Sequence, residues 1–146
     1  MADFTFNGFH IHYEDIGSGE PLLLLNGIFM SCDSWLDFIA PLSNNNRLLL
    51  LDFVDQGKSG KASSDYDISM QADLLEAFLD ELGLETVNLA GVSYGGQVAI
   101  IFAASRPGRV DKLFLANTCG YTSKWLLDVG KSWLYSFESH DHHQFF

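Results

Sequence analysis

The sequence contains little cysteine, which limits the kinds of site that it can build. Cys32 and Cys119 are its two cysteines among 146 residues, too few and too far apart for a disulfide framework or a metal cluster. Reduced thiols are typical of the cytosol. We therefore expect a cytoplasmic protein that holds neither a metal ion nor an organic cofactor.

Basic residues and long apolar runs are also scarce. Eight Lys and Arg stand against 19 Asp and Glu, for a formal net charge of −11. Such a charge repels nucleic acids and anionic membranes. No 18 apolar residues run together, and the stretch 1–6 lacks a basic segment followed by an apolar one. We expect no nucleic-acid partner, no membrane insertion and no export.

What the sequence does contain is an ordinary globular mixture, 47% hydrophobic and 18% charged, of a length that can bury a sizeable core. Alternating residues on either side of Gly8 predict an antiparallel hairpin. Apolar runs typical of buried parallel strands then alternate with helical patterns. The predicted strands are 3–7, 9–16, 22–25, 47–52, 86–90 and 110–116, and the predicted helices are 33–41, 66–82, 97–104 and 124–137. This alternation predicts an α/β fold, a three-layer α/β/α sandwich with a mostly parallel sheet.

The most informative stretch is Gly91-Val92-Ser93-Tyr94-Gly95, which lies between a predicted strand and a predicted helix. A G-x-S-x-G motif in this context is typical of a nucleophile elbow, a tight turn that exposes a reactive serine. Side chains at Gly91 and Gly95 would collide with the neighbouring strand and helix. A glycine-rich turn without chemistry is the alternative interpretation.

Other patterns are weaker. Gly57-Lys58-Ser59 resembles part of a phosphate-binding loop, but Asp52 stands where that motif needs its first glycine. His10 and His12 share one face of a predicted strand, where packing or solvent contact is the simpler role. The terminal stretch 139–143 contains three histidines and one aspartate, typical of a polar tail rather than of a metal site or a catalytic base.

From about Phe9 to Thr118 the chain resembles the N-terminal half to two-thirds of an α/β-hydrolase. The G-x-S-x-G elbow matches the nucleophile motif of that family. Asn26-Gly27-Ile28 stands where the family has His-Gly-x after its third strand. The segment 52–59 resembles the family's D-x-x-G-x-G-x-S loop, with Asp55 in place of the first glycine.

The resemblance implies a serine hydrolase that acts on a small ester or similar acyl substrate. Ser93 would be the nucleophile, and the backbone N–H groups of Tyr94 and Ile28 would form the oxyanion hole. The supporting residues would be Asn26, Gly27, Gly91 and Gly95. Because Asn26 replaces the usual histidine, transfer of an acyl group to an acceptor other than water stays open.

The same resemblance implies that part of the site is missing. In this fold the acid and the histidine follow the serine, yet the chain has neither of the later strands that would carry them. Asn117, Asp111 and Asp128 are unsuitable as the acid, and we expect no general-base histidine in the chain. We therefore expect an incomplete, inactive chain, or a module of this fold that only binds.

Two structural expectations follow. Residues 1–121 would form the N-terminal part of the hydrolase core, and residues 122–146 would begin a helical lid and end in the polar tail. The aromatic residues Trp125, Trp133, Tyr135 and Phe137 would give that lid an apolar face, although ordinary packing explains them equally well. The strand 110–116 would be an uncovered sheet edge, through which the chain could associate with itself.

Overall fold

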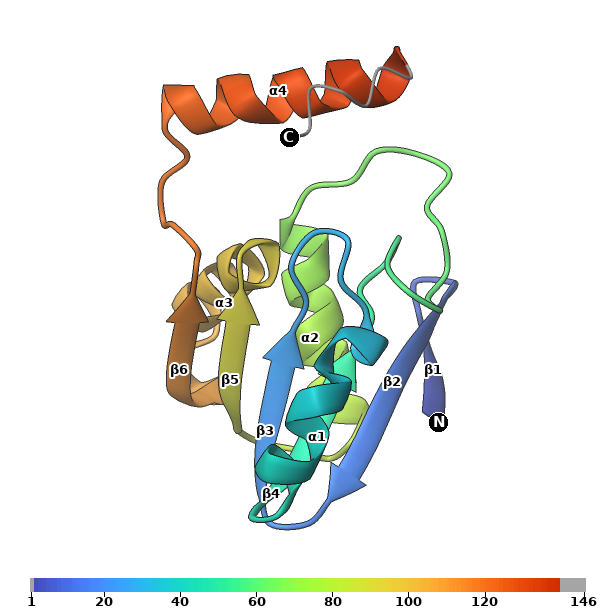
Figure 1. Ribbon diagram of the computed structural model, residues 1–146. Helices are drawn as coiled ribbons and strands as arrows, with labels where there is room; N and C mark the ends of the chain where they lie inside the picture. The colour runs from blue at the N-terminus through green and yellow to red at the C-terminus, as the bar shows by residue number, and fades with distance from the viewer. Residues whose placement is uncertain (1, 140–146) are drawn as a thin grey trace.

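The sheet is the centre of the molecule (Figure 1). The computed structural model describes residues 2–139. Six strands form one sheet, namely β1 (Ala2–Phe6), β2 (Phe9–Gly17), β3 (Glu20–Leu25), β4 (Asn46–Leu51), β5 (Val87–Val92) and β6 (Val110–Ala116). Their order is β1-β2-β4-β3-β5-β6. The pairs β4–β3, β3–β5 and β5–β6 are parallel, whereas β1–β2 and β2–β4 are antiparallel. The predicted mostly parallel sheet is confirmed.

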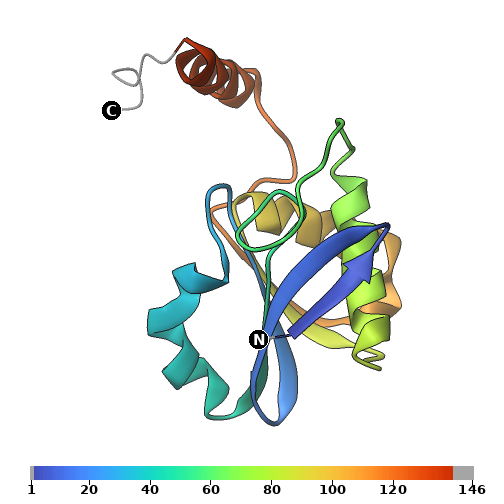
Figure 2. The same ribbon diagram turned by 90° about the vertical axis from the view of Figure 1, so that its right-hand side faces the viewer.

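Helices cover the two faces of this sheet unequally (Figure 2). The helices are α1 (Leu36–Ser43), α2 (Ser69–Glu81), α3 (Tyr94–Ser105) and α4 (Lys124–Glu138), with short 3-10 turns η1 (Cys32–Trp35) and η2 (Pro107–Arg109). The larger core lies under α2 and α3, where Phe78 and Phe102 are fully buried. A smaller core lies under α1 and includes Trp35 and Leu50. The α/β/α layering predicted from the sequence is therefore confirmed.

The N-terminal hairpin forms as its sequence predicts. Asn7 and Gly8 both have positive φ angles, 49° and 84°, as a two-residue hairpin turn requires. This places Asp3 directly opposite His12 across the two strands.

Three helices differ from their predicted bounds, and one of them, predicted over 97–104, begins at Tyr94 directly after the elbow. The helix predicted over 66–82 begins at Ser69, because the Asp67 carboxylate accepts a hydrogen bond of 2.7 Å from the Ser69 N–H. The helix predicted over 33–41 is divided into η1 and α1. Its expected apolar stripe is only partly buried, since Leu36 and Phe38 are 64% and 53% exposed.

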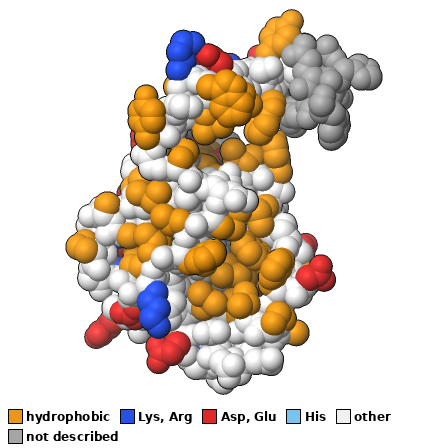
Figure 3. Space-filling view, turned by 60° about the vertical axis from the view of Figure 1, so that its left-hand side comes forward, with side chains coloured by type: hydrophobic (Ala, Val, Ile, Leu, Met, Phe, Trp, Pro, Cys, Tyr) orange, Lys and Arg blue, Asp and Glu red, His pale blue; other side chains and the backbone are white. Residues whose placement is uncertain are grey.

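The outer strand β6 and the helix α4 carry exposed apolar side chains. Within the described chain β6 is an edge of the sheet, and its Leu113, Phe114 and Leu115 are exposed. Figure 3 shows hydrophobic side chains gathered on this side of the molecule. Helix α4 stands away from the other elements, beyond the carboxyl ends of β3, β5 and β6 (Figure 1). None of the helices in residues 2–139 combines the length and apolar character that a membrane span requires.

Candidate active site

Ser93 lies at the junction of β5 and α3, in the strained conformation expected of an elbow. Its φ and ψ angles are 51° and −114°, a region that side-chain-bearing residues rarely occupy. The backbone holds it there, because its N–H donates to the Ala116 carbonyl at 2.9 Å and its carbonyl accepts from the Gln97 N–H at 3.1 Å. The residue is exposed, and its hydroxyl forms no hydrogen bond with residues 2–139.

Glycines around the serine allow the tight crossing of backbone segments. A Cβ atom at Gly91 would lie 2.6 Å from the Gly95 carbonyl oxygen, and one at Gly95 would lie 2.5 Å from the Leu25 carbonyl oxygen. Both contacts are with backbone, which cannot rotate away. Gly96 is equally restricted, because a Cβ there would lie 2.6 Å from Cβ of Thr118.

The loop after β3 is anchored by the fully buried Asn26 side chain. Its amide nitrogen donates to the Leu51 carbonyl at 2.9 Å and to Asp52 Oδ1 at 3.2 Å. Its oxygen accepts from Trp35 Nε1 at 2.7 Å. The amide thus bonds to three surrounding segments, which fixes where the following loop begins.

Gly27 to Met30 form a turn that brings this loop against the elbow. The Met30 N–H donates to the Gly27 carbonyl at 3.2 Å, and Gln56 Nε2 donates to the same carbonyl at 3.0 Å. A Cβ at Gly27 would lie 3.5 Å from the Ser93 Cβ. The turn that carries Ile28 is therefore a direct neighbour of the serine.

A cavity of about 290 Å³ is lined by both the turn 27–30 and the start of α3. It is lined by Ile28, Phe29, Val54, Asp55, Gln56, Tyr66 and Tyr94. Burial and the neighbouring Asp55 carboxylate raise the pKa of Tyr66 to about 12, so its phenol stays neutral at physiological pH. Ile28 and Tyr94, which the sequence singled out separately, thus line the same hollow.

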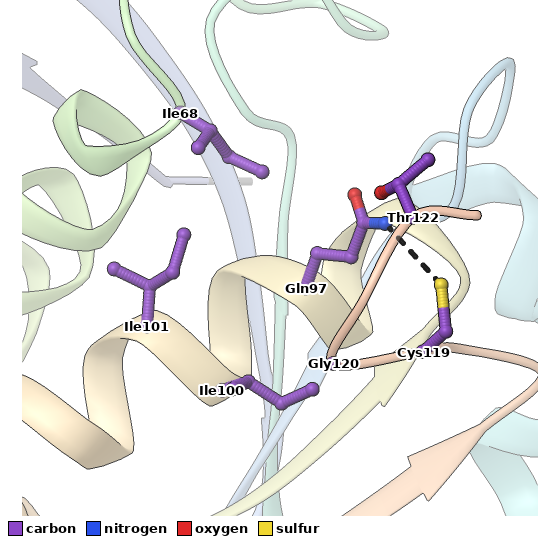
Figure 4. Close-up of a pocket in the computed structure, with 7 residues that line it drawn as sticks. All are labelled: Ile68, Gln97, Ile100, Ile101, Cys119, Gly120 and Thr122. Carbon is purple, nitrogen blue, oxygen red and sulfur yellow. Dashed lines mark hydrogen bonds between the residues drawn. The ribbon is translucent and has the colours of Figure 1, made fainter. Parts of the chain in front are cut away.

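A second cavity, of about 190 Å³, lies between α3, the start of α2 and the segment after β6 (Figure 4). Three isoleucine side chains and the Cys119 segment line it, and Gln97 Nε2 approaches Cys119 Sγ at 3.8 Å. Gln97 is one helical turn beyond Ser93, so this cavity is adjacent to the elbow without including the serine.

The loop 52–59 closes around Asp52. Asp52 Oδ2 accepts from the Lys58 N–H at 2.9 Å, and Ser59 Oγ donates to the Asp52 carbonyl at 2.6 Å. A Cβ at Gly57 would lie 2.0 Å from Asp52 Oδ2. Asp55, which replaces a glycine of the resembled motif, has a φ of 72°, and its carboxylate accepts from the Ala62 N–H at 2.9 Å.

The part of the chain that the structure describes brings no histidine to Ser93. His10 and His12 both contact Asp3 and lie on β2, which β4 and β3 separate from β5. Asp111 accepts from Thr86 Oγ1, and Asp128 pairs with Lys124 on α4. The histidines of the terminal stretch 139–143 lie outside the described residues.

Comparison with known proteins agrees with the fold. The family model described as alpha/beta hydrolase fold matches residues 20–139, so the chain belongs to the α/β hydrolase family. Its similarity extends to a solved α/β hydrolase, MGS-M2, from a Medee basin deep-sea metagenome library. The two share 36% identity and a TM-score of 0.92, over 94% of this chain and 52% of that one. The resemblance inferred from the sequence is confirmed.

Relatives with a described activity include hydrolases of different kinds. The soluble epoxide hydrolase of Corynebacterium sp. (strain C12) is 32% identical over 76% of this chain and 39% of the relative. A 2-hydroxy-6-oxononadienedioate/2-hydroxy-6-oxononatrienedioate hydrolase of Paraburkholderia phymatum is 38% identical over 72% of this chain and 38% of the relative. The chain thus spans less than half of the length of these curated relatives.

Several supporting residues were not identified from the sequence. Gln56 and Met30 hold the Gly27 carbonyl, and Thr118 packs on Gly96 and donates to the Ser93 carbonyl at 2.8 Å. Gln56 and Thr118 lie on loops far from their partners in sequence. Met30 bonds through its backbone N–H, which its residue type does not reveal. Only the second glycine of the Gly95-Gly96 pair offered a signal, because adjacent glycines indicate close backbone approach.

Proposed function

We propose that this chain carries part of the active site of a serine-type α/β hydrolase that acts on small esters or related acyl compounds. Ser93 would be the nucleophile, and the turn 27–30 would be the oxyanion loop. Ser93 Oγ would attack the substrate carbonyl carbon, and the ester C–O bond would then break, which releases the protonated alcohol and leaves an acyl-enzyme. Water would then release the acid and restore the serine. The observation that carries this proposal is an exposed serine, held at a φ of 51° at the start of α3, beside the Gly27 turn.

Two backbone donors suit the negative charge that develops on the carbonyl oxygen. The first N–H groups of a helix have no partner within the helix, and that of Tyr94 is the first of α3. The N–H of Ile28 belongs to the turn beside Ser93 and forms no hydrogen bond within residues 2–139. Removing one such donor typically lowers turnover by about 10² to 10³.

The proton of the serine hydroxyl needs an acceptor that residues 2–139 do not provide near Ser93. Loss of the base in a serine hydrolase lowers turnover by about 10⁶. We propose that the acid and the histidine belong to a further part of the fold, which would pack against β6. Residues 1–121 then form the N-terminal part of the core, and residues from 122 begin a lid that includes α4.

Two alternatives rest on other observations. Asn26 holds its loop by hydrogen bonds alone and cannot titrate at neutral pH, so acyl transfer to an acceptor other than water fits the same geometry. A binding module without catalysis fits a Ser93 that has no histidine beside it among residues 2–139. We also place the protein in the cytoplasm, because both cysteines are free.

Labelling with a fluorophosphonate probe tests the proposal. The probe is applied to the 146-residue chain and to the polypeptide expressed from the whole gene, with intact-mass and peptide analysis. We expect the whole product to be labelled at Ser93 and the 146-residue chain to be labelled far more slowly. Ser93→Ala should abolish labelling, whereas Ser63→Ala, at another exposed serine, should leave it unchanged.

The outcomes separate the candidates. Absence of labelling in a whole product with a cooperative thermal transition would refute the serine-hydrolase proposal and favour the binding module. If labelling occurs, product analysis with an ester substrate in the presence of a competing alcohol or thiol distinguishes hydrolysis from transfer. Reading the coding DNA beyond Phe146 for an Asp and a later His tests independently where the base comes from.

A further inference from the structure

A second cluster of reactive side chains lies behind the oxyanion loop, apart from Ser93. His12, Cys32 and Asp52 come from β2, η1 and the end of β4, and all three are at least 98% buried. One potential ligand atom from each lies within 4.8 Å of the others. Nitrogen, sulfur and oxygen donors thus converge in the interior from three distant parts of the sequence.

The imidazole of His12 is oriented as that of a metal ligand. Its Nδ1 lies 3.2 Å from Asp3 Oδ1, so the tautomer with the proton on Nδ1 donates to that carboxylate. Nε2 then presents its lone pair inward. It is buried and forms no hydrogen bond, although Glu14 Oε1 lies 3.3 Å away. A carboxylate behind a histidine is the arrangement that orients metal-bound imidazoles in proteins.

Glu14 supplies a fourth donor from the same strand face as His12. Residues two apart on a strand point to the same side, and the Glu14 side chain is 25% exposed. This carboxylate is therefore the member of the proposed ligand set that solvent reaches.

We propose that His12, Cys32 and Asp52, with Glu14 as the fourth ligand, bind a zinc ion. Zinc favours four ligands of this mixed nitrogen, sulfur and oxygen type at about 2.0 to 2.3 Å. Ligand atoms of a tetrahedral site are then separated by roughly 3.3 to 3.8 Å. Side-chain rotations would bring His12, Cys32 and Asp52 from their present separations, all within 4.8 Å, onto an ion, and Glu14 would turn in from its place beside His12. On binding, the Cys32 thiol loses its proton to solvent and becomes a thiolate ligand.

The negative charges of the cluster favour this occupant. Asp3, Glu14 and Asp52 place carboxylates beside His12 and Cys32. Burial and the Asp52 carboxylate raise the pKa of the Cys32 thiol by more than the Lys58 ammonium lowers it. Buried carboxylates need a cation or hydrogen-bond donors. Asp52 has donors from Cys32, Asn26 and Lys58, and a divalent ion would add the charge that these neutral groups lack.

The ion would act as a brace for the oxyanion loop. It would join β2 to η1 and to Asp52, which also bonds to Asn26 at the start of that loop. The proposal does not depend on Ser93 being catalytic, because the site would stabilise the fold in an inactive module as well.

The test is metal titration of the chain in a background with His140, His142 and His143 changed to Ala, so that the tail adds no ligands. Zn²⁺ alone is titrated by calorimetry and by thermal melting. Co²⁺ alone is titrated by absorption spectroscopy, in which thiolate ligation gives a charge-transfer band. We expect one equivalent of metal, a raised melting temperature and a thiolate band.

Two matched pairs of variants locate the site. Cys32→Ser should abolish the thiolate band, and Cys119→Ser should keep it. His12→Gln should weaken Zn²⁺ binding at least tenfold, whereas His10→Gln, two residues along the same strand, should not. Asp3→Asn should weaken binding about 10- to 100-fold by loosening the imidazole.

Clear results would overturn the proposal. One is the absence of both Zn²⁺ binding and a thiolate band in the folded chain in which only the three tail histidines have been changed to Ala. This result needs no substitution at a proposed ligand. Another is a band that disappears with Cys119→Ser rather than Cys32→Ser. Equal effects of His10→Gln and His12→Gln would also contradict it. Circular dichroism of each variant checks that loss of binding is not loss of fold.

Discussion

Trp35 Nε1 donates a hydrogen bond of 2.7 Å to Asn26 Oδ1, which joins the last residue of η1 to the residue that follows β3. The bond occupies the oxygen of an amide whose nitrogen already bonds to Leu51 and Asp52. Asn26 is fully buried and Trp35 nearly so. The indole therefore helps to fix the amide from which the Ile28 turn projects.

We expect Asn26→Leu to destabilise the fold by about 3 kcal/mol. The substitution leaves the Trp35 N–H without its acceptor and removes one of the three donors to the Asp52 carboxylate. Loss of a buried partner typically costs about 1 to 3 kcal/mol. Trp35→Phe should also destabilise. Urea denaturation of both single variants and of the double variant measures the coupling.

The double variant completes a double-mutant cycle with the two single variants. Because both residues share one bond, its loss of stability should be smaller than the sum of the single losses by about 1 kcal/mol. Strictly additive losses would show that the indole and the amide stabilise the fold independently.

The sequence predicted the architecture well because its signals are local. Continuous apolar runs such as 22–25 identify buried strands, and Gly91 and Gly95 identify the elbow. The cluster at His12 could not be predicted in this way. It depends on the antiparallel register that sets Asp3 opposite His12 and on the end of β4 reaching Cys32, which are contacts between distant segments.

The steric role of Gly95 predicts a sharp effect of a single methyl group. Gly95→Ala would place Cβ 2.5 and 2.6 Å from the carbonyl oxygens of Leu25 and Asn26. Overpacking against backbone typically costs about 1 to 3 kcal/mol or more, so the melting temperature should fall and labelling of Ser93 should be lost. Gly108→Ala is the control, because nothing lies within 4 Å of its added Cβ. A Gly95→Ala variant as stable as Gly108→Ala would contradict the close crossing.

Asp67 predicts a pH dependence of stability at the start of α2. Hydrogen bonds from Ser69 lower the pKa of the Asp67 carboxyl below its usual value. A carboxyl with a lowered folded-state pKa stabilises the fold above its unfolded-state pKa, and this contribution disappears as the pH falls through the folded-state value.

The variant Asp67→Asn keeps an oxygen that can accept the Ser69 N–H but does not titrate. Wild type should therefore lose more melting temperature than Asp67→Asn as the pH is lowered from neutral to below the ordinary aspartate range. Asp65→Asn, at a neighbouring exposed carboxylate, should follow wild type. Parallel pH curves for wild type and Asp67→Asn would show that the carboxylate charge contributes nothing to the start of the helix.

The exposed edge at β6 predicts self-association of the 146-residue chain. Phe114 is 67% exposed on an edge strand, beside the exposed Leu113 and Leu115. An unpaired strand with apolar side chains offers both hydrogen bonds and apolar area to a second copy. Phe114→Glu should lower the apparent mass in light scattering at a given concentration, because a carboxylate resists burial in such an interface.

Leu36→Glu introduces the same charge at a residue that is 64% exposed on α1, and should leave the association unchanged. A wild-type chain that is monomeric at all concentrations would refute association through this edge, whereas equal effects of both substitutions would assign it to net charge alone.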